Sequence, residues 1–271
     1  MVLVNGVLSD HVRVFDRGLM YGDGVFRTLL VREGRPLCWQ RHYDKLCTDC
    51  AALGIDCPAE DRLLAEMGRL LGATPDCVLK VIITRGEGAR GYAVPEQIEP
   101  TVILMTGLIP LYPAQHFSDG VRLHLCSTRL AIQPRLAGIK HLNRLENVLA
   151  RREWSDPEIA EGLMLDTEDN VIEGTMSNLF LLQGSMLYTP DLGRCGVAGV
   201  QRARIMDLAG RLGLEVKVEN LSLDRVYDAD EILLCNSVFS VWQVRELERK
   251  KWRAGNLAAR LRAFLNDDAL N

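Results

Sequence analysis

Apolar and polar residues follow two different periods in the first hundred residues of the chain. Strands are expected where apolar side chains alternate with polar ones or form short runs, and helices where they recur every three or four positions. Three glycines make the segment 15–24 rich in turns. On this basis the pattern predicts strands over 1–7, 25–32, 77–84 and 101–106, and helices over about 40–54 and 59–72.

A similar mixture of strand and helix patterns resumes after residue 120. The stretch 107–118 carries Pro110 and Pro113 and is the best candidate for a linker. We therefore expect an N-terminal domain over 1–106 and a C-terminal domain over 119–271, both of the α/β (α+β) class. In the second domain the pattern predicts strands over 121–127, 163–166, 179–182, 186–188, 215–219 and 231–235, and helices over about 142–154, 199–212 and 254–266.

The composition is that of an ordinary globular protein. Of the 271 residues, 48% are hydrophobic and 25% are charged. The formal net charge of −4 gives no electrostatic reason to expect nucleic acid or an anionic membrane as a partner. No apolar run approaches the roughly 18 residues of a membrane helix, and residues 1–18 lack a signal-peptide pattern. We therefore expect a cytoplasmic protein.

Eight cysteines are expected to be reduced, because the chain is neither short nor marked for export. Cys47 and Cys50 form a C-x-x-C, with Cys38 and Cys57 nearby, and such a spacing can hold zinc or carry out thiol exchange. The same stretch also has the periodicity of an amphipathic helix, and no second C-x-x-C completes four zinc ligands. We expect these thiols to act as small hydrophobes and predict no metal site, with a zinc-dependent thiol protein as an alternative.

A glycine-rich loop follows the strand 77–84. Residues 86–91 match a literal G-x-G-x-x-G, but the segment 92–95 ends in proline and does not begin the helix that a dinucleotide pyrophosphate requires. We therefore do not expect a Rossmann site. Arg85 and Arg90 bracket the loop and suit the bidentate binding of carboxylates, and a solvated hairpin tip is the plain alternative.

Two ionisable residues have unusual surroundings. The chain has only six lysines beside 26 arginines, and Lys140 lies in a largely uncharged stretch, where desolvation would lower the pKa of its amine. The alternative is that Lys140 is an ordinary lysine at a helix start. Lys80 alternates with apolar residues and is expected to be solvated. Glu173 lies in a strand-turn-strand pattern. Either Thr175 or Ser177 holds this acid, or it faces the protonated ring nitrogen of a pyridine cofactor.

Six motifs follow one another along the chain: Phe15-Asp-Arg-Gly with Tyr21-Gly-Asp-Gly-Val-Phe26, His42-x-x-Lys45-Leu, Thr84-Arg-Gly to Gly91-Tyr92, the segment 136–149 around Lys140, Glu173-Gly with Ser177-Asn-Leu-Phe180, and Gly196-Val-Ala-Gly199-Val-Gln-Arg202. In this order they resemble the fold-type IV pyridoxal-phosphate enzymes, which include branched-chain and D-amino acid aminotransferases and aminodeoxychorismate lyase. The resemblance covers nearly the whole chain and implies the two-domain fold of the D-amino acid aminotransferases. The segment 136–149 is most similar to the lyase, because the aminotransferases have other residues after the lysine.

The resemblance implies how a cofactor would be held. Lys140 would carry pyridoxal 5'-phosphate as a Schiff base, and Glu173 would bond to the pyridine nitrogen, whose protonation makes the ring a better electron sink. The phosphate is expected at the start of a helix, where N–H groups point outward. Lys45 takes a position where the family usually has arginine, so it supplies charge without the bidentate fork. The residues expected around the phosphate are Lys45, Val200, Gln201, Asn236 and Ser237.

The resemblance also implies a reaction, namely the conversion of 4-amino-4-deoxychorismate into 4-aminobenzoate and pyruvate, a step toward folate. The enzyme would be a homodimer whose substrate pocket is lined by Phe26, Thr28, Arg90 and Tyr92. Arg90 would hold a substrate carboxylate, and Thr28 would assist a proton transfer. The nearest alternative is a D-amino acid or branched-chain aminotransferase of the same fold. A second alternative is a binding protein that keeps the fold and has lost the cofactor.

Overall fold

The chain divides into two compact units in a computed structural model, which describes residues 1–72 and 74–268. Unit 1 comprises Met1–Pro110 and Ile139–Asn143, and unit 2 comprises Leu111–Gly138 and the described residues from Arg144 onward. The split between Pro110 and Leu111 falls inside the stretch expected to be a linker. The short segment Ile139–Asn143, which contains Lys140, groups with unit 1, although the residues on both sides of it belong to unit 2.

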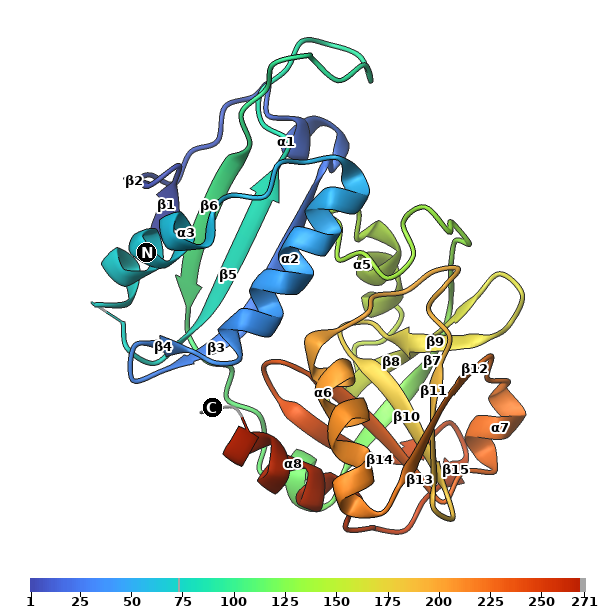
Figure 1. The fold of residues 1–271 in the computed structure, drawn as a ribbon. Helices are drawn as coiled ribbons and strands as arrows, with labels where there is room; N and C mark the ends of the chain where they lie inside the picture. The colour runs from blue at the N-terminus through green and yellow to red at the C-terminus, as the bar shows by residue number, and fades with distance from the viewer. Residues whose placement is uncertain (73, 269–271) are drawn as a thin grey trace. The chain divides into compact units, whose positions relative to one another are not determined.

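Unit 1 is an antiparallel sheet with two longer helices on one face (Figure 1). Its described elements are β1 (Val2–Val4), β2 (Val7–Leu8), α1 (Arg17–Tyr21), β3 (Gly24–Arg32), β4 (Arg35–Pro36), α2 (Trp39–Leu53), α3 (Glu60–Leu71), β5 (Cys77–Thr84) and β6 (Thr101–Gly107). The strand order is β2-β1-β6-β5-β3-β4, and each of these pairings is antiparallel. Helices α2 and α3 cover the central strands of this sheet.

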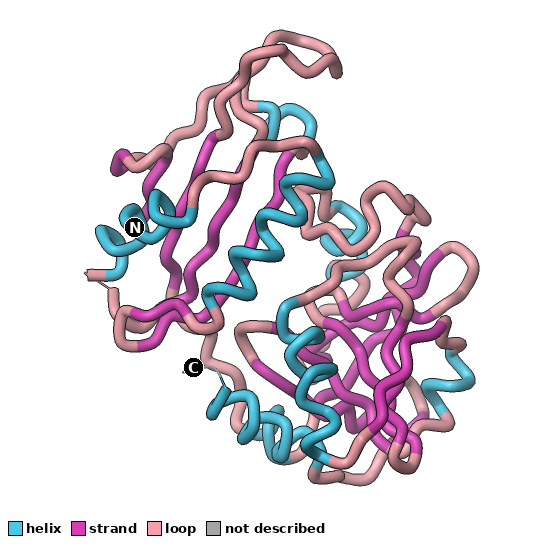
Figure 2. The backbone as a smooth tube through the Cα atoms, in the orientation of Figure 1, coloured by secondary structure: helices cyan, strands magenta, loops and turns pink. Residues whose placement is uncertain are grey.

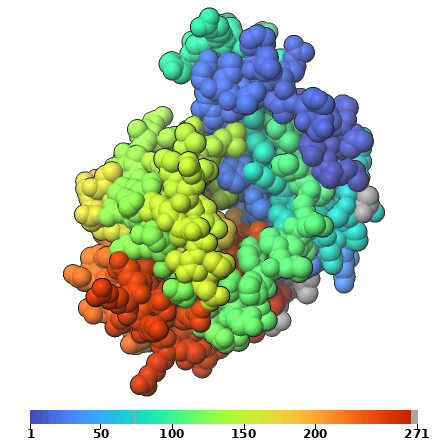
Figure 3. All heavy atoms as spheres, turned by 180° about the vertical axis from the view of Figure 1, so that it is seen from behind, coloured from blue at the N-terminus to red at the C-terminus, as the bar shows by residue number. Residues whose placement is uncertain are grey.

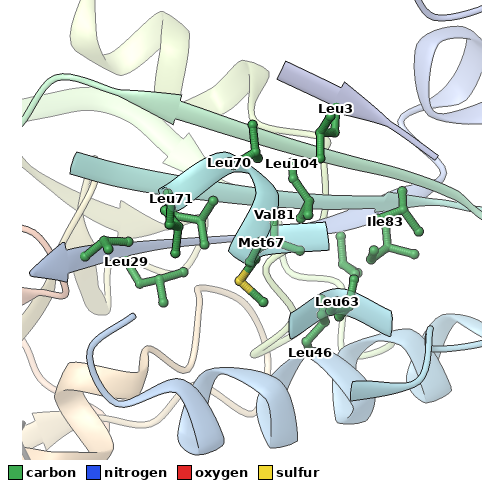
Figure 4. Packing of buried hydrophobic residues seen from close by; sticks show 14 of the residues in the cluster. Leu3, Leu29, Leu46, Leu63, Met67, Leu70, Leu71, Val81, Ile83 and Leu104 are labelled. Carbon is green, nitrogen blue, oxygen red and sulfur yellow. The ribbon is translucent and has the colours of Figure 1, made fainter. Parts of the chain in front are cut away.

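Alternation along the strands builds the core of unit 1. Leu29 on β3 and Leu79 on β5 are fully buried, whereas their neighbours in the sequence are partly exposed. Leu46 from α2 and Met67 from α3 pack against this face of the sheet (Figure 4). Each such buried side chain contributes about 1.5–3 kcal/mol of hydrophobic free energy. The alternation of apolar and polar residues along the strands therefore determines which face of the sheet α2 and α3 cover.

Unit 2 is built on a larger mixed sheet, whose strands are magenta in Figure 2. Its described elements are α4 (Gln115–Ser118), β7 (Val121–Leu130), α5 (Leu145–Arg151), β8 (Ile159–Asp166), β9 (Val171–Gly174), β10 (Asn178–Gln183), β11 (Met186–Pro190), α6 (Val200–Leu208), a 3-10 turn (Ala209–Leu212), β12 (Glu215–Glu219), α7 (Leu223–Tyr227), β13 (Glu231–Asn236), β14 (Ser240–Leu247), β15 (Lys250–Lys251) and α8 (Leu257–Asp268). The strand order is β12-β11-β10-β13-β14-β7-β8-β9, with β15 paired to β14.

Helices α6 and α8 pack against one face of the unit 2 sheet. Ile205 of α6 and Leu261 of α8 are fully buried in a cluster with Phe180 of β10 and Leu233 of β13. A separate buried cluster includes Trp242 of β14. None of the helices in the described residues is long and apolar enough to cross a membrane.

The predicted elements are largely confirmed, with informative exceptions. Strand β5 spans the predicted residues 77–84, and α2, α3 and β3 lie where the periodicity placed them. Strand β14 was missed because Val241–Val244 are all buried, so the strand shows no clean alternation of apolar and polar residues. The helix predicted over 142–154 begins only at Leu145. The short helices α1, α4 and α7 were also not predicted.

Candidate active site

Lys140 lies in an extended segment that pairs with the start of β3. The N–H of Phe26 donates to the carbonyl of Lys140 at 2.9 Å, and the N–H of Leu142 donates to the carbonyl of Gly24, also at 2.9 Å. A Cβ atom at Gly24 would lie 2.5 Å from the carbonyl oxygen of Ile83, so only glycine allows this close approach. The pairing explains why the following helix starts later than predicted. Two backbone hydrogen bonds thus hold the segment around Lys140 against β3.

The backbone N–H of Lys140 donates to a buried carboxylate on α2. This acceptor is Oδ2 of Asp49, at 3.1 Å, and Asp49 is only 1% exposed. Arg27 of β3 forms an ion pair with Oδ2 of the same carboxylate, and Lys45 of α2 forms one with Oδ1. Two cations and a backbone donor therefore share one carboxylate, which offsets the cost of burying these charges. Neither Asp49 nor Arg27 was expected from the sequence to take part in the site.

Lys45, expected near the cofactor phosphate, is thus part of an ion-pair network in unit 1. Burial and, secondarily, the charge of Arg27 lower the pKa of Lys45 to about 7. Burial also lowers the pKa of Arg27 to about 10. Because the neighbouring carboxylate of Asp49 favours the charged amine, the state of Lys45 near neutral pH is sensitive to this pair.

Two lysine amines approach the same aromatic ring. The Nζ atom of Lys140 is 4.7 Å from the centre of the Phe26 ring, and the Nζ atom of Lys80 is 4.9 Å from it. Lys80 also lies opposite Thr28 in the register of β3 and β5. Lys80 was expected to be solvated, but its amine packs over the ring and the residue is partly buried. Unit 1 thus brings Lys140, Phe26 and Thr28 together with a second amine.

The loop between β5 and β6 holds Arg90 and Tyr92 at the surface of unit 1. Both side chains are exposed, Tyr92 to 85%, and the Tyr92 ring lies 5.4 Å from the ring of Tyr21. Arg17 donates to three backbone carbonyls of the loop. Figure 3 shows the loop in green beside the blue N-terminal segment. Within the described residues of unit 1, no hydrogen bond or ring contact joins Arg90 or Tyr92 to Phe26.

Arg85 does not serve as the second carboxylate-binding arginine that the loop suggested. Its guanidinium donates to both carboxylate oxygens of Asp23 and to the carbonyls of Leu53 and Gly54, and the residue is 8% exposed. Although burial raises the pKa of Asp23, hydrogen bonds from Arg85 and Arg17 bring it below its usual value. The prediction for Arg85 is wrong because its donors are already used inside unit 1.

Glu173 is a buried acid on β9 of unit 2. Its Oε2 atom accepts the N–H of Val197 at 2.9 Å and the amide Nδ2 of Asn178 at 3.4 Å. Asn178 in turn donates to the carbonyl of Val197 and accepts the N–H of Gly199. Glu173 and Asn178 therefore shape the chain that leads into α6.

Thr175 and Ser177, the alternative partners for Glu173, bind another acid. Both hydroxyls donate to Glu161 of β8, a residue that is 1% exposed. Burial raises the pKa of Glu161, and these hydrogen bonds partly compensate. Glu161 therefore stabilises the turn, whereas Glu173 faces the start of α6.

Two of the residues expected around a phosphate, Val200 and Gln201, lie at the start of α6. Helix α6 begins at Val200 and Gln201, and its first-turn N–H groups are the natural donors for an anion. A Cβ at Gly199 would lie 2.3 Å from Oδ1 of Asn178, so the entry to the helix requires glycine. The Nε2 atom of Gln201 lies 3.4 Å from Oγ of Ser240, which links α6 to the turn between β13 and β14.

That second turn is organised by Asn236. The Oδ1 atom of Asn236 accepts the N–H groups of Val238 and Phe239, each at 2.9 Å, and Ser237 lies between Asn236 and Val238 on the turn. The predicted residues Val200, Gln201, Asn236 and Ser237 therefore belong to two adjoining turns of unit 2. Backbone N–H groups at a helix start and a serine hydroxyl are donors of the kind that suits a phosphate group.

The chain that leads to Lys140 is tied to the same part of unit 2. Gly138, two residues before the lysine, donates to the carbonyl of Gly196 at 2.9 Å and accepts the N–H of Ala198 at 3.1 Å. Among the described residues, no group of three or more histidine, cysteine, aspartate or glutamate side chains could hold a metal ion. The donors gathered in unit 2 are those of an anion site next to a buried carboxylate.

The chain is similar to known proteins over its whole length. Residues 24–247 match the family amino-transferase class IV. The aminodeoxychorismate lyase of Vibrio harveyi is 35% identical and covers 98% of this chain and 100% of its own. The crystal structure of 4-amino-4-deoxychorismate lyase from Pseudomonas aeruginosa is 47% identical, with a TM-score of 0.94 and 99% of each chain covered. A PLP-bound hypothetical aminotransferase from Mycobacterium tuberculosis shares the fold at 20% identity, with a TM-score of 0.82 and 100% and 99% covered. The chain belongs to the class IV aminotransferase family.

Proposed function

We propose that this protein is a pyridoxal-phosphate-dependent lyase that converts 4-amino-4-deoxychorismate into 4-aminobenzoate and pyruvate. The observation that carries the proposal is the similarity to two lyases with this substrate name, each covering nearly the whole chain. The lyase-like segment 136–149 supports it. A D-amino acid or branched-chain aminotransferase of the same family is the second candidate, because it would use the same fold and lysine.

The residues of unit 2 fit the cofactor. Backbone N–H groups at Val200 and Gln201, together with the turn at Asn236 and Ser237, would bind its phosphate. Glu173 would bond to the ring nitrogen, since its carboxylate is buried beside the same loop. When bound, pyridoxal phosphate supplies an electron sink for bond breaking at the substrate carbon that carries nitrogen.

Lys140 is the acid and base of the proposed reaction. Its amine removes the hydrogen from the substrate ring carbon that bears nitrogen, and it later returns a proton to the departing enolpyruvyl group, which becomes pyruvate. Pairing with β3 and the hydrogen bond to Asp49 hold its backbone. Aromatisation drives the elimination, so the protein's main task is to orient these proton transfers.

The two substrate carboxylates need cationic donors. Arg90 can bind one of them if its loop lies over the bound substrate, and we assign Lys80 as a second donor, because its amine already lies over Phe26 beside Lys140. Phe26 and Tyr92 offer aromatic surfaces for the substrate ring. Thr28 lies opposite Lys80 in the sheet register and would assist a proton transfer.

The assembly and location are also part of the proposal. The resemblance to fold-type IV enzymes supports a homodimer in which loop residues near Arg90 approach the neighbouring subunit's site. A formal charge of −4 gives no electrostatic attraction to nucleic acid or an anionic membrane, and the lyase would act on its small-molecule substrate in the cytoplasm. Size-exclusion chromatography with light scattering measures the assembly directly.

Pyruvate release without a keto-acid acceptor tests the lyase. The protein, loaded with pyridoxal phosphate, is mixed with 4-amino-4-deoxychorismate, and pyruvate is followed by coupled NADH oxidation with lactate dehydrogenase. Equal amounts of pyruvate and 4-aminobenzoate are expected, and none with Lys140→Ala. If turnover requires an added keto acid that becomes aminated, the aminotransferase is the correct function. A purified protein with no cofactor absorbance and no turnover would support a binding protein.

A further inference from the structure

Three thiols of unit 1 lie together where α2 ends and the connection to α3 begins. Cys47 and Cys50 are on α2, and Cys57 is in the connection. The Sγ atoms of Cys47 and Cys57 are 2.8 Å apart, which is less than 1 Å longer than the roughly 2.05 Å of a disulfide bond. The C-x-x-C spacing suggested a pair between Cys47 and Cys50, but the fold brings Cys47 against Cys57. Cys50 is fully buried.

Local hydrogen bonds hold the two segments in this position. The N–H of Ile55 donates to the carbonyl of Cys50 at 2.9 Å, and the hydroxyl of Tyr43 donates to the carbonyl of Pro58 at 3.1 Å. The chain reverses at Gly54, whose φ of +66° is natural for glycine. Because the backbone already brings the sulfurs together, a bond between them needs little movement.

Exposure separates the pair from the other thiols nearby. Cys47 and Cys57 are each partly exposed, whereas Cys50 and Cys77 are buried. Part of each of these two residues is therefore open to solvent. All of these cysteines are free thiols in the structure.

We propose that Cys47 and Cys57 form a reversible thiol–disulfide modification site that is oxidised by low-molecular-weight disulfides. The Cys47 thiolate attacks one sulfur of the small disulfide, and the sulfur–sulfur bond of the reagent breaks to release one thiolate. The Cys57 thiolate then attacks the Cys47 sulfur and releases the second. The two cysteine protons end on the two released thiols, so the protein pair loses two electrons and the small disulfide gains them.

The surroundings of the pair make the exchange slow at neutral pH. Burial raises the pKa of Cys47 to about 11. A hydrogen bond with Cys50, followed by burial, raises the pKa of Cys57 as well. Since the thiolate is the nucleophile, the reaction is best measured at mildly alkaline pH. The other titratable groups that act on this pair are Tyr43, Asp44 and, through Tyr43, Glu60.

The proposed bond would join the second half of α2 to the connection that follows it. Cys47 lies two residues before Asp49, the acceptor for the Lys140 N–H. Closing this short loop restricts the unfolded chain more than the native one, where the sulfurs already meet. We therefore expect the oxidised protein to unfold at a temperature higher by a few degrees than the reduced protein.

One tryptic peptide reports the result directly, because residues 46–62 contain Cys47, Cys50 and Cys57 between two cleavage sites. The full-length protein is incubated with oxidised glutathione at about pH 8.5, the remaining thiols are blocked with N-ethylmaleimide, and the peptide is sequenced by tandem mass spectrometry. We expect a peptide with a Cys47–Cys57 bond and a single maleimide on Cys50, and dithiothreitol should restore three free thiols. Urea added before the oxidant should abolish the preference for Cys57 over Cys50.

Serine variants separate this pair from other arrangements. Cys57→Ser should stop at a glutathione adduct on Cys47, and Cys47→Ser should form no bond within the peptide. Cys50→Ser is the matched control and should still give the Cys47–Cys57 bond. The proposal is overturned if the folded protein keeps all three thiols, stops at a glutathione adduct, or joins Cys47 to Cys50.

Discussion

The two units of the chain hold their buried carboxylates in different ways. Asp49 in unit 1 is paired with the cations Arg27 and Lys45 and also accepts the N–H of Lys140. Glu173 in unit 2 accepts neutral N–H groups from Val197 and Asn178. An ion-pair network stabilises one arrangement of its own unit, whereas Glu173 is anchored by a backbone N–H and a side-chain amide in the loop that leads into α6.

This difference assigns separate tasks to the units. Unit 1 fixes the backbone of Lys140 and gathers amines over the Phe26 ring. Unit 2 provides the helix start, the neighbouring turn and Glu173, all suited to an anionic pyridine cofactor. Variants in unit 1 should therefore disturb stability and the lysine, and variants at Glu173 should disturb the electronic contribution of the cofactor.

The largest effect is expected for Asp49→Asn. The substitution leaves the guanidinium of Arg27 buried without its carboxylate, a change that typically costs about 3–5 kcal/mol. The unfolding temperature should fall by on the order of 6 °C or more, as measured by differential scanning calorimetry. Asp44→Asn, an exposed carboxylate on the same helix, is the control and should change it little. Equal unfolding temperatures for Asp49→Asn and wild type would show that the ion-pair network does not stabilise unit 1.

Glu173→Gln should lower kcat by about 100-fold, close to 2.7 kcal/mol, because the neutral amide no longer keeps the cofactor ring protonated. The affinity for pyridoxal phosphate should change much less, since the donors at α6 remain. Steady-state kinetics and cofactor titration measure the two quantities. Glu161→Gln is the comparison in unit 2. It should lower the unfolding temperature and leave kcat nearly unchanged. Wild-type turnover in Glu173→Gln would exclude Glu173 from the mechanism.

Arg90→Ala should reduce kcat/KM for 4-amino-4-deoxychorismate by about 30-fold, or roughly 2 kcal/mol, as expected for a charge pair that becomes desolvated. Lys80→Ala should reduce it at least as much, because its amine already lies over Phe26. Cofactor retention should stay unchanged in both variants. Arg32→Ala, at the far end of β3, is the control. A change of less than about twofold for Arg90→Ala would mean that the loop is a solvated tip.

The smallest effect concerns Lys45 and pH. With a pKa of about 7, Lys45 is charged at lower pH and neutral at higher pH, so affinity for pyridoxal phosphate should weaken by about tenfold or less as the pH rises through this value. Lys45→Arg should flatten the dependence, because arginine stays charged. Fluorescence titration of the apoprotein measures both. If Lys45→Met keeps the wild-type pH dependence, unit 2 binds the phosphate without help from unit 1.

The sequence predicted the elements that carry a clear period, such as β5 and α3, and the motifs pointed to Lys140 and Glu173. It could not predict the Asp49 network, because the carboxylate and the Lys140 N–H are separated by 91 residues and meet only in the fold. Arg85 was misjudged for the same reason, since Asp23 lies 62 residues away in the chain. Polar partners that are far apart in the sequence produce no periodic pattern, so they cannot be recognised before the fold is known.

Borohydride reduction followed by peptide mapping identifies the lysine that carries the cofactor. The protein loaded with pyridoxal phosphate is reduced, digested and sequenced by mass spectrometry, with Lys140→Ala as the control. We expect the cofactor to become attached to Lys140 and the control to carry no label. Attachment to Lys80 or Lys45 in the native protein, with Lys140 unlabelled, would contradict it.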